Sequence, residues 1–135
     1  MRENLFKAKR KDNGEWVEGY YRADPDLNMH FICGWDYYLS ENGLEREPFE
    51  YEIDPDTLCQ YTGLVDKNGK KIWENDIVRN EKGDIGVVQW FEEHAAFMIW
   101  NKTKNCVCYL AENDFSKIEV IGNIFDNADL LEVEQ

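Results

Sequence analysis

The stretch from residue 61 to residue 78 constrains the fold of this chain more than any other segment. It reads Tyr61-Thr-Gly-Leu-Val-Asp-Lys-Asn-Gly-Lys-Lys-Ile-Trp-Glu-Asn-Asp-Ile-Val78. Its centre, Asn68-Gly69, predicts a β-hairpin, because Asn and Gly accept the positive φ values of a type I′ turn or a glycine bulge. Leu64-Val65 before the turn and Ile72-Trp73 after it are β-forming pairs. The segment therefore predicts two short antiparallel strands, and its residues suit a fold rather than a catalytic site.

The composition is that of one folded domain. The chain has 135 residues, of which 43% are hydrophobic and 14% aromatic. A chain of this length buries roughly two-thirds of its unfolded surface and needs no disulfide or metal to fold. Its apolar runs are too short to span a bilayer, and its N-terminal residues lack the apolar core of a signal peptide. We therefore expect a cytoplasmic protein that does not contact membranes.

The formal net charge is −13, from 28 acidic and 15 basic residues. Such a chain repels phosphate backbones, so direct binding to nucleic acid is disfavoured. Two interpretations of the charge stay open. It can serve only solubility, or it can let the protein imitate a nucleic acid.

Three segments resemble the YopX family, whose members are small proteins of phages and of prophages of Gram-positive bacteria. The most specific is Cys59-Gln-Tyr-Thr-Gly-Leu-Val-Asp-Lys-Asn-Gly-Lys-Lys-Ile-Trp-Glu-Asn-Asp-Ile-Val78. Met1 to Arg10 together with Asn13 to Gly19 resemble the family's opening, and Glu119 to Leu131 resemble its close. The resemblance implies a β-rich fold similar to an SH3-type barrel and a location inside a host bacterium. It implies no reaction and no catalytic residues.

Two positions depart from the family pattern. Asn75 stands where the family usually has Gly, and Asn is the next most tolerant residue of a left-handed backbone. Ala128 stands where the family usually has Pro at the start of a helix, so the last helical turn should begin less sharply. We expect the fold to tolerate both changes.

The order of turns and apolar runs predicts a mostly β chain. Residues 4–9 and 15–21 form an expected hairpin around Asp12-Asn13-Gly14, followed by a short strand at 29–33 and an edge strand at 34–39. Short strands then recur up to residue 122, with tight turns between them, which is typical of a small antiparallel barrel. We predict one domain over residues 1–135. About 1–58 form the N-terminal hairpin and a variable acidic insertion, and about 59–135 form an SH3-like barrel with a C-terminal helical turn.

Two sets of residues are candidates for binding. The first is an aromatic protein interface, because aromatic side chains outside the barrel concentrate binding energy; its members are Trp16, Tyr20, Trp35 and Tyr37. The second is an acidic face within the insertion, formed by Glu45, Glu47, Glu50, Glu52 and Asp54. Acids at every second position of a strand line up in water, so a merely solvated face is the alternative for this second set.

The sequence offers no combination of residues that predicts catalysis or a cofactor. It has no phosphate-binding glycine loop, and its serines are only Ser40 and Ser116, so no Ser-His-Asp arrangement is expected. The four cysteines are expected to be reduced, buried thiols. A metal site is not predicted, although Cys106 and Cys108 with Cys33, Cys59, His30 or His94 contain suitable ligand types.

We therefore predict a non-enzymatic accessory protein of phage or prophage origin that binds protein and forms a homo-oligomer. The partner is a second copy or another host or phage protein, and no cofactor, metal, nucleic acid or membrane is involved. The alternative is an acidic nucleic-acid mimic that inhibits a host enzyme acting on DNA or RNA.

Overall fold

The computed structural model describes residues 4–132. The chain divides into two compact units, residues 1–60 and residues 61–135, and each is described by itself. The sequence predicts one domain with a division near residue 58. The chain passes from the first unit to the second within one strand, β5 (Cys59–Val65).

The first unit is an antiparallel sheet in the order β4-β3-β2-β1-β5. Its other strands are β1 (Phe6–Lys9), β2 (Trp16–Asp24), β3 (Met29–Ser40) and β4 (Gly43–Glu52). A short 3-10 helix, η1 (Pro55–Thr57), connects β4 to β5, whose first two residues pair with β1. The expected first hairpin is present, and β1 and β2 pair around the turn at residues 11–13.

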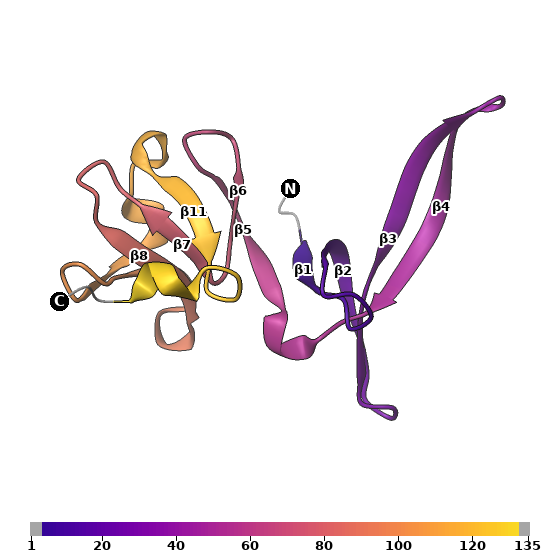
Figure 1. Ribbon diagram of the computed structural model, residues 1–135, viewed down its shortest axis with the longest axis horizontal. Coiled ribbons are helices and arrows are strands. Elements are labelled where there is room, and N and C mark those ends of the chain that lie inside the picture. Colours follow the sequence, from indigo (N-terminus) through magenta and orange to yellow (C-terminus); the bar gives the residue numbers. More distant parts are fainter. Residues whose placement is uncertain (1–3, 133–135) are drawn as a thin grey trace. The chain divides into compact units, whose positions relative to one another are not determined.

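The strands β3 and β4 extend beyond the rest of this sheet. The pairing of β2 with β3 ends at Cys33, whereas β3 and β4 stay paired from Phe31↔Glu52 to Ser40↔Gly43. Residues 34–49 therefore form a two-stranded ribbon with its own turn, which we call the arm; Figure 1 shows it projecting from β1 and β2. The sequence predicted separate strands at 29–33 and 34–39, but the structure has a single strand of 12 residues.

The core of the first unit lies on one face of its sheet. Ala8, Ile32 and Ile53 are fully buried there. Half-buried side chains pack against them, namely Phe6, Val17, Tyr21, Phe49 and Leu58. The side chains alternate along each strand, so Trp16, Tyr20 and Cys33 lie on the opposite face.

Gly34 lets the ring of Phe49 lie close to the backbone at the base of the arm. The two residues are partners across β3 and β4, and a Cβ atom at Gly34 would lie 2.8 Å from the Phe49 ring. Gly34→Ala should therefore push the ring off the core and lower the free energy of unfolding by about 1–3 kcal/mol. Urea unfolding of the two proteins measures this difference. Equal unfolding midpoints would show that the ring moves at no cost.

The second unit is built on a five-stranded antiparallel sheet in the order β10-β9-β8-β7-β11. Its strands are β7 (Asp76–Arg79), β8 (Ile85–Phe91), β9 (Ala96–Asn101), β10 (Cys106–Tyr109) and β11 (Glu119–Asn123), and β6 (Lys71–Trp73) pairs with the end of β5. Four short 3-10 helices complete the unit: η2 (Glu92–His94), η3 (Leu110–Glu112), η4 (Phe115–Lys117) and η5 (Ala128–Leu131). The last one occupies the position of the expected helical turn.

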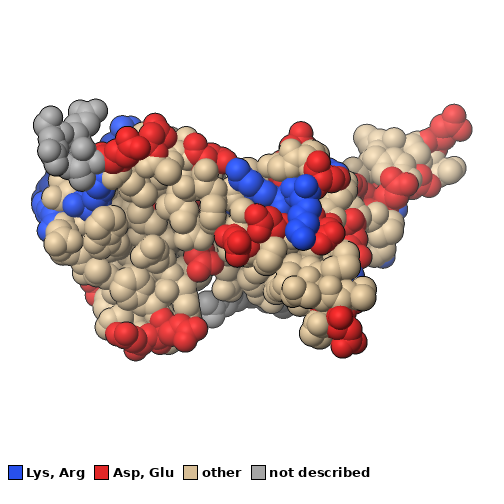
Figure 2. Space-filling view, turned by 60° about the horizontal axis from the view of Figure 1, so that its bottom comes forward, with Lys and Arg blue, Asp and Glu red and all other residues tan. Residues whose placement is uncertain are grey.

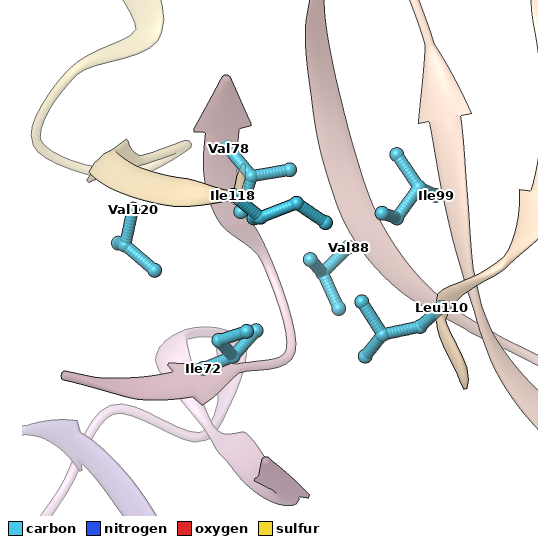
Figure 3. Packing of buried hydrophobic residues seen from close by; sticks show 7 residues of the cluster. All are labelled: Ile72, Val78, Val88, Ile99, Leu110, Ile118 and Val120. Carbon is cyan, nitrogen blue, oxygen red and sulfur yellow. The ribbon is translucent and has the colours of Figure 1, made fainter. Parts of the chain in front are cut away.

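The core of the second unit gathers aliphatic side chains from the sheet, from β6 and from the 3-10 segments. Figure 3 shows these side chains converging; they are Ile72, Val78, Val88, Ile99, Leu110, Ile118 and Val120. On the other face of the sheet, Ile77 and Val87 are buried as well. Both faces of β7 and β8 are therefore covered.

The prediction of a mostly β, antiparallel fold is confirmed. A closed barrel is not formed by the described residues, because the sheet of the second unit ends in two unjoined edge strands, β10 and β11. The Asn68-Gly69 hairpin is present, with Gly69 at a φ of 76° and β5 paired to β6 across it. Asn75 adopts the predicted left-handed conformation, with a φ of 72°.

Candidate protein-binding surface

The register of β3 and β4 gives the arm two different sides. Residues that face each other across the ribbon point to the same side, and successive residues alternate. One side, which we call the apolar side, carries the pairs Trp35↔Pro48, Tyr37↔Arg46 and Leu39↔Leu44. The other, the acidic side, carries Asp36↔Glu47 and Tyr38↔Glu45.

The apolar side is open to solvent. The exposed fractions are 83% for Leu39, 69% for Leu44, 63% for Tyr37 and 45% for Trp35. Since no third strand or helix of the first unit, as described from residue 4 on, covers the ribbon, these side chains lack the core that would normally bury them. Clustered exposed apolar side chains of this kind mark interaction sites.

Arg46 lies in the middle of this apolar side. Its guanidinium carbon is 3.9 Å from the centroid of the Trp35 ring, which is the geometry of a cation–π contact. Arg46 forms no ion pair with a carboxylate among residues 4–132. The side thus combines Trp, Tyr and Arg, the residue types enriched at binding hot spots.

The four aromatic residues predicted as an interface share one face of the first unit. Tyr20 pairs with Cys33, and it is 60% exposed. It lines a shallow hollow together with Cys33, Trp35 and Pro48, so the apolar side of the arm continues onto the sheet. Trp16 lies further along the same face and is half-buried.

Two lysines cover Trp16. The Lys7 and Lys9 ammonium groups lie 4.7 Å and 5.4 Å from the centroid of its ring. Trp16 is therefore less available to a partner than Tyr20, Trp35 and Tyr37. The sequence alone does not predict Leu39, Leu44 and Pro48 as part of the interface, because only the register of the ribbon places them beside Trp35 and Tyr37.

The structure divides the predicted acidic residues among three places. Glu45 and Glu47 lie on the acidic side of the arm. Glu50 and Glu52 point to the opposite face, because each is separated from Glu45 and Glu47 by an odd number of positions along β4. Asp54 lies outside β4, where its side chain accepts a hydrogen bond from the Asp56 N–H at the start of η1.

The two acids at the base of β4 have basic partners. Glu50 accepts two hydrogen bonds from Arg22, at 2.9 Å and 3.0 Å, and these raise the pKa of Arg22. Glu52 forms an ion pair with Lys11 at 3.2 Å. Acidic side chains form separate patches rather than one row on the face that Figure 2 shows. The five acids therefore do not make one acidic face.

Among the described residues of the first unit, Cys33 is the histidine or cysteine that lines this surface. The Tyr21 hydroxyl is 2.6 Å from His30 Nδ1, and His94 contacts Tyr109. Cys59 is buried, whereas Cys106 is exposed and Cys33 and Cys108 are half-buried, so the expectation of buried thiols holds for Cys59 alone. Within residues 4–132, no three His, Cys, Asp or Glu side chains are grouped as metal ligands.

The acidic residues of the 59–78 segment serve the fold. The buried Asp66 carboxylate accepts hydrogen bonds from the N–H groups of Asn68, Lys70 and Val120, each 2.9 Å long. Asp76, also buried, accepts one from the Trp73 N–H at 2.8 Å. Both carboxylates thus fix turns, in agreement with the view that this segment specifies structure.

Among residues 4–132, no helix has the length and apolar character that crossing a membrane requires.

Comparison with known proteins places the chain by sequence and by fold. The family model described as YopX protein matches residues 5–132. No curated protein sequence matches the chain. Two solved structures are similar in fold. The protein EF1440 from Enterococcus faecalis has 21% identity and a TM-score of 0.57, covering 98% of this chain and 100% of its own. The protein yopX from Bacillus subtilis has 15% identity and a TM-score of 0.55, covering 95% of this chain and 98% of its own. Because the family model spans nearly the whole sequence, the chain belongs to the YopX family.

Proposed function

We propose that this protein is a non-enzymatic protein-binding module of phage or prophage origin that forms a homo-oligomer through the apolar side of the arm. The observation that carries the proposal is the exposure of Trp35, Tyr37, Leu39 and Leu44 on one side of a ribbon that no other described element of the first unit covers. A second copy of the chain is a partner that is always present. Self-association of soluble proteins commonly gives closed symmetric oligomers.

The energetics of a two-stranded ribbon support this proposal. An isolated hairpin is marginally stable in water, because it has no core to offset the entropy of ordering its residues. The arm nevertheless pairs continuously from Gly34 to Ser40. Packing its apolar side against another surface would remove large side chains from water, each worth about 1.5–3 kcal/mol when fully buried.

Tyr37 and Tyr38 provide a matched test, since these neighbours have the same chemistry and point to opposite sides of the arm. We expect Tyr37→Ser to raise the dissociation constant of the oligomer at least about 30-fold, because removing a hot-spot aromatic costs about 2 kcal/mol or more. Tyr38→Ser, which removes a ring that is 43% exposed, should leave the constant within about threefold. Sedimentation equilibrium measures both values.

Two results would contradict the proposal. If Tyr37→Ser and Tyr38→Ser weaken the oligomer equally, the arm is required for association but its apolar side is not the contact surface. A wild-type protein that stays monomeric at all concentrations would remove self-association altogether.

The acidic nucleic-acid mimic is the second candidate, and one observation favours it. Asp36, Glu45 and Glu47 lie together on the acidic side of the arm. Along β4, Glu45 and Glu47 are spaced by roughly 7 Å, the two-residue repeat of a strand, which is similar to the spacing of phosphates. The net charge of −13 adds long-range attraction to a basic enzyme.

The charge-neutral variant Glu45→Gln/Glu47→Gln tests the mimic. A basic enzyme that acts on DNA or RNA should be retained from bacterial lysate by the wild-type protein, released by moderate salt and lost with the variant. Retention by both proteins to the same extent would exclude the acidic side as a phosphate mimic.

A further inference from the structure

We propose that two copies pack the apolar sides of their arms face to face and antiparallel, so that Arg46 of each copy pairs with Glu50 of the other. This inference rests on the proposed self-association and specifies its geometry. A second copy of this chain covers the apolar side, because the charged groups on that face are complementary between two copies.

The face that contains the apolar side presents its residues in a fixed order. From the base of the arm to its tip, the cross-strand pairs are Cys33↔Glu50, Trp35↔Pro48, Tyr37↔Arg46 and Leu39↔Leu44. The carboxylate of Glu50 at the base and the guanidinium of Arg46 nearer the tip belong to the same strand. They lie on either side of the uncharged Trp35↔Pro48 pair.

A two-fold axis through the Trp35↔Pro48 pair reverses this order in the second copy. When the axis lies in the contact plane and crosses the arm at right angles, each strand faces the same strand of the other copy. The Tyr37↔Arg46 pair of one copy then faces the Cys33↔Glu50 pair of the other. Arg46 meets the carboxylate of Glu50, and Tyr37 faces the shallow hollow that Tyr20, Cys33 and Trp35 line.

The Arg46 guanidinium and the Glu50 carboxylate can both accept a further partner. The guanidinium of Arg46 has no carboxylate partner among residues 4–132, and it lies over an apolar ring. Glu50 is exposed and already binds Arg22, but a carboxylate has about four lone-pair positions and can accept bonds from a second arginine. Stacked sheets lie about 10 Å apart, a gap that the side chains of Arg and Glu span together.

The parallel arrangement lacks this complementarity. With the two-fold axis along the arm, β3 of one copy faces β4 of the other, so Arg46 faces Tyr37 and Glu50 faces Cys33. Both arrangements cover the apolar side, but only the antiparallel one gives Arg46 an acidic partner. An unpaired arginine buried in an interface is costly, which favours the antiparallel packing.

The test is a mixing experiment with charge-reversal variants. Arg46→Glu alone places a second carboxylate against Glu50 of the other copy, and Glu50→Arg alone places two guanidinium groups together. Each variant should therefore self-associate at least about tenfold more weakly than wild type. In an equal mixture, the two variants can form a heterodimer. In the antiparallel packing, this heterodimer has two contacts between positions 46 and 50 of opposite copies. One contact then joins the two unaltered positions and the other joins the two altered positions, so both are between opposite charges. We expect native mass spectrometry of the mixture to give a heterodimer with an affinity within about threefold of the wild-type dimer.

Glu47→Arg is the matched control, because Glu47 is the neighbouring acid on the acidic side of the arm. It should self-associate like wild type and should not rescue Arg46→Glu. If Glu50→Arg fails to fold beside Arg22, the neutral variants Arg46→Gln and Glu50→Gln replace the pair. Each should weaken the dimer, and the double variant should be no weaker than the single ones.

Other outcomes separate this inference from the proposed function. Charge-reversal variants that dimerise like wild type, or folded variants that do not rescue each other, would overturn the antiparallel packing. If Tyr37→Ser still weakens the oligomer in that case, self-association through the apolar side stands. A monomeric wild type would overturn both.

Discussion

Asp66→Ala is expected to destabilise the second unit by about 3–5 kcal/mol. The side chain is 5% exposed, and its two oxygens accept hydrogen bonds from three backbone N–H groups. Two of these donors, Asn68 and Lys70, belong to the hairpin turn, and the third, Val120, belongs to β11. Alanine removes three hydrogen bonds to a charged acceptor, each worth about 1.5–3 kcal/mol, and it leaves the buried Val120 N–H without an acceptor.

The effect should be largest at the contact between the turn and β11. Val120 N–H donates to Asp66 Oδ2, and Lys67 N–H donates to the carbonyl of Ile118, also at 2.9 Å. Ile118 and Val120 are members of the buried cluster. Hydrogen exchange of the Val120 amide measures the opening of this contact directly, and we expect it to become at least about 100-fold faster, because 3 kcal/mol corresponds to more than two factors of ten.

Two variants bracket the result. Asp66→Asn keeps one acceptor oxygen but places an NH2 group near one donor, so its cost should be smaller, about 1–2 kcal/mol. Asp114 also accepts a backbone hydrogen bond in a turn, from the Ser116 N–H, but it is exposed, so Asp114→Ala should change little. Equal exchange rates at Val120 in Asp66→Ala and wild type would mean that water replaces the carboxylate.

The contribution of Asp66 should depend on pH with a definite sign. Burial by itself would raise the pKa of Asp66, but the N–H groups of Val120, Lys70 and Asn68 outweigh it and hold the pKa below its ordinary value. The folded chain therefore binds this proton less readily than the unfolded chain. The stabilisation is complete above the unfolded pKa of about 4 and is lost as the pH falls through the folded value. The difference between wild type and Asp66→Ala should shrink below pH 4.

The hairpins were predictable from the sequence because their determinants are local. Asn68-Gly69 and Asn75 lie in turns whose backbone requires positive φ, and few residue types accept it. The same reasoning placed the first hairpin around residues 12–14. The open sheet of the second unit was not predictable in this way, because closure depends on whether the edge strands β10 and β11 meet, which is a long-range property.

The arm could not be predicted because its two essential features are not local. Gly34 reads as a break between two strands, but in the structure it makes room for Phe49 and β3 continues through it. The side to which each residue points follows from the register with β4. Trp35 and Tyr37 were recognised as candidates from residue type alone, whereas Leu39 and Leu44 became part of the surface only through their pairing.

Removal of the arm is expected to abolish self-association without unfolding the first unit. Gly34 and Phe49 are cross-strand partners, so Asn-Gly in place of residues 35–48 would close the strands with a two-residue turn of the type that antiparallel pairs favour. The buried core cluster of this unit, formed by Ala8, Ile32 and Ile53, lies outside the deletion. The shortened protein should unfold within a few degrees of the wild-type midpoint and sediment as a monomer.

The deletion distinguishes an appendage from a structural element. The core of the first unit draws on β1, β2, the base of β3 and the end of β4, and Phe49 is the arm residue that packs against it. The deleted residues 35–48 are not part of that core, and their exposed Trp35, Tyr37, Leu39 and Leu44 lower solubility unless a partner covers them. If the shortened protein associates as tightly as wild type, the contact lies elsewhere on the chain. If it unfolds, the arm is a structural element that stabilises the first unit.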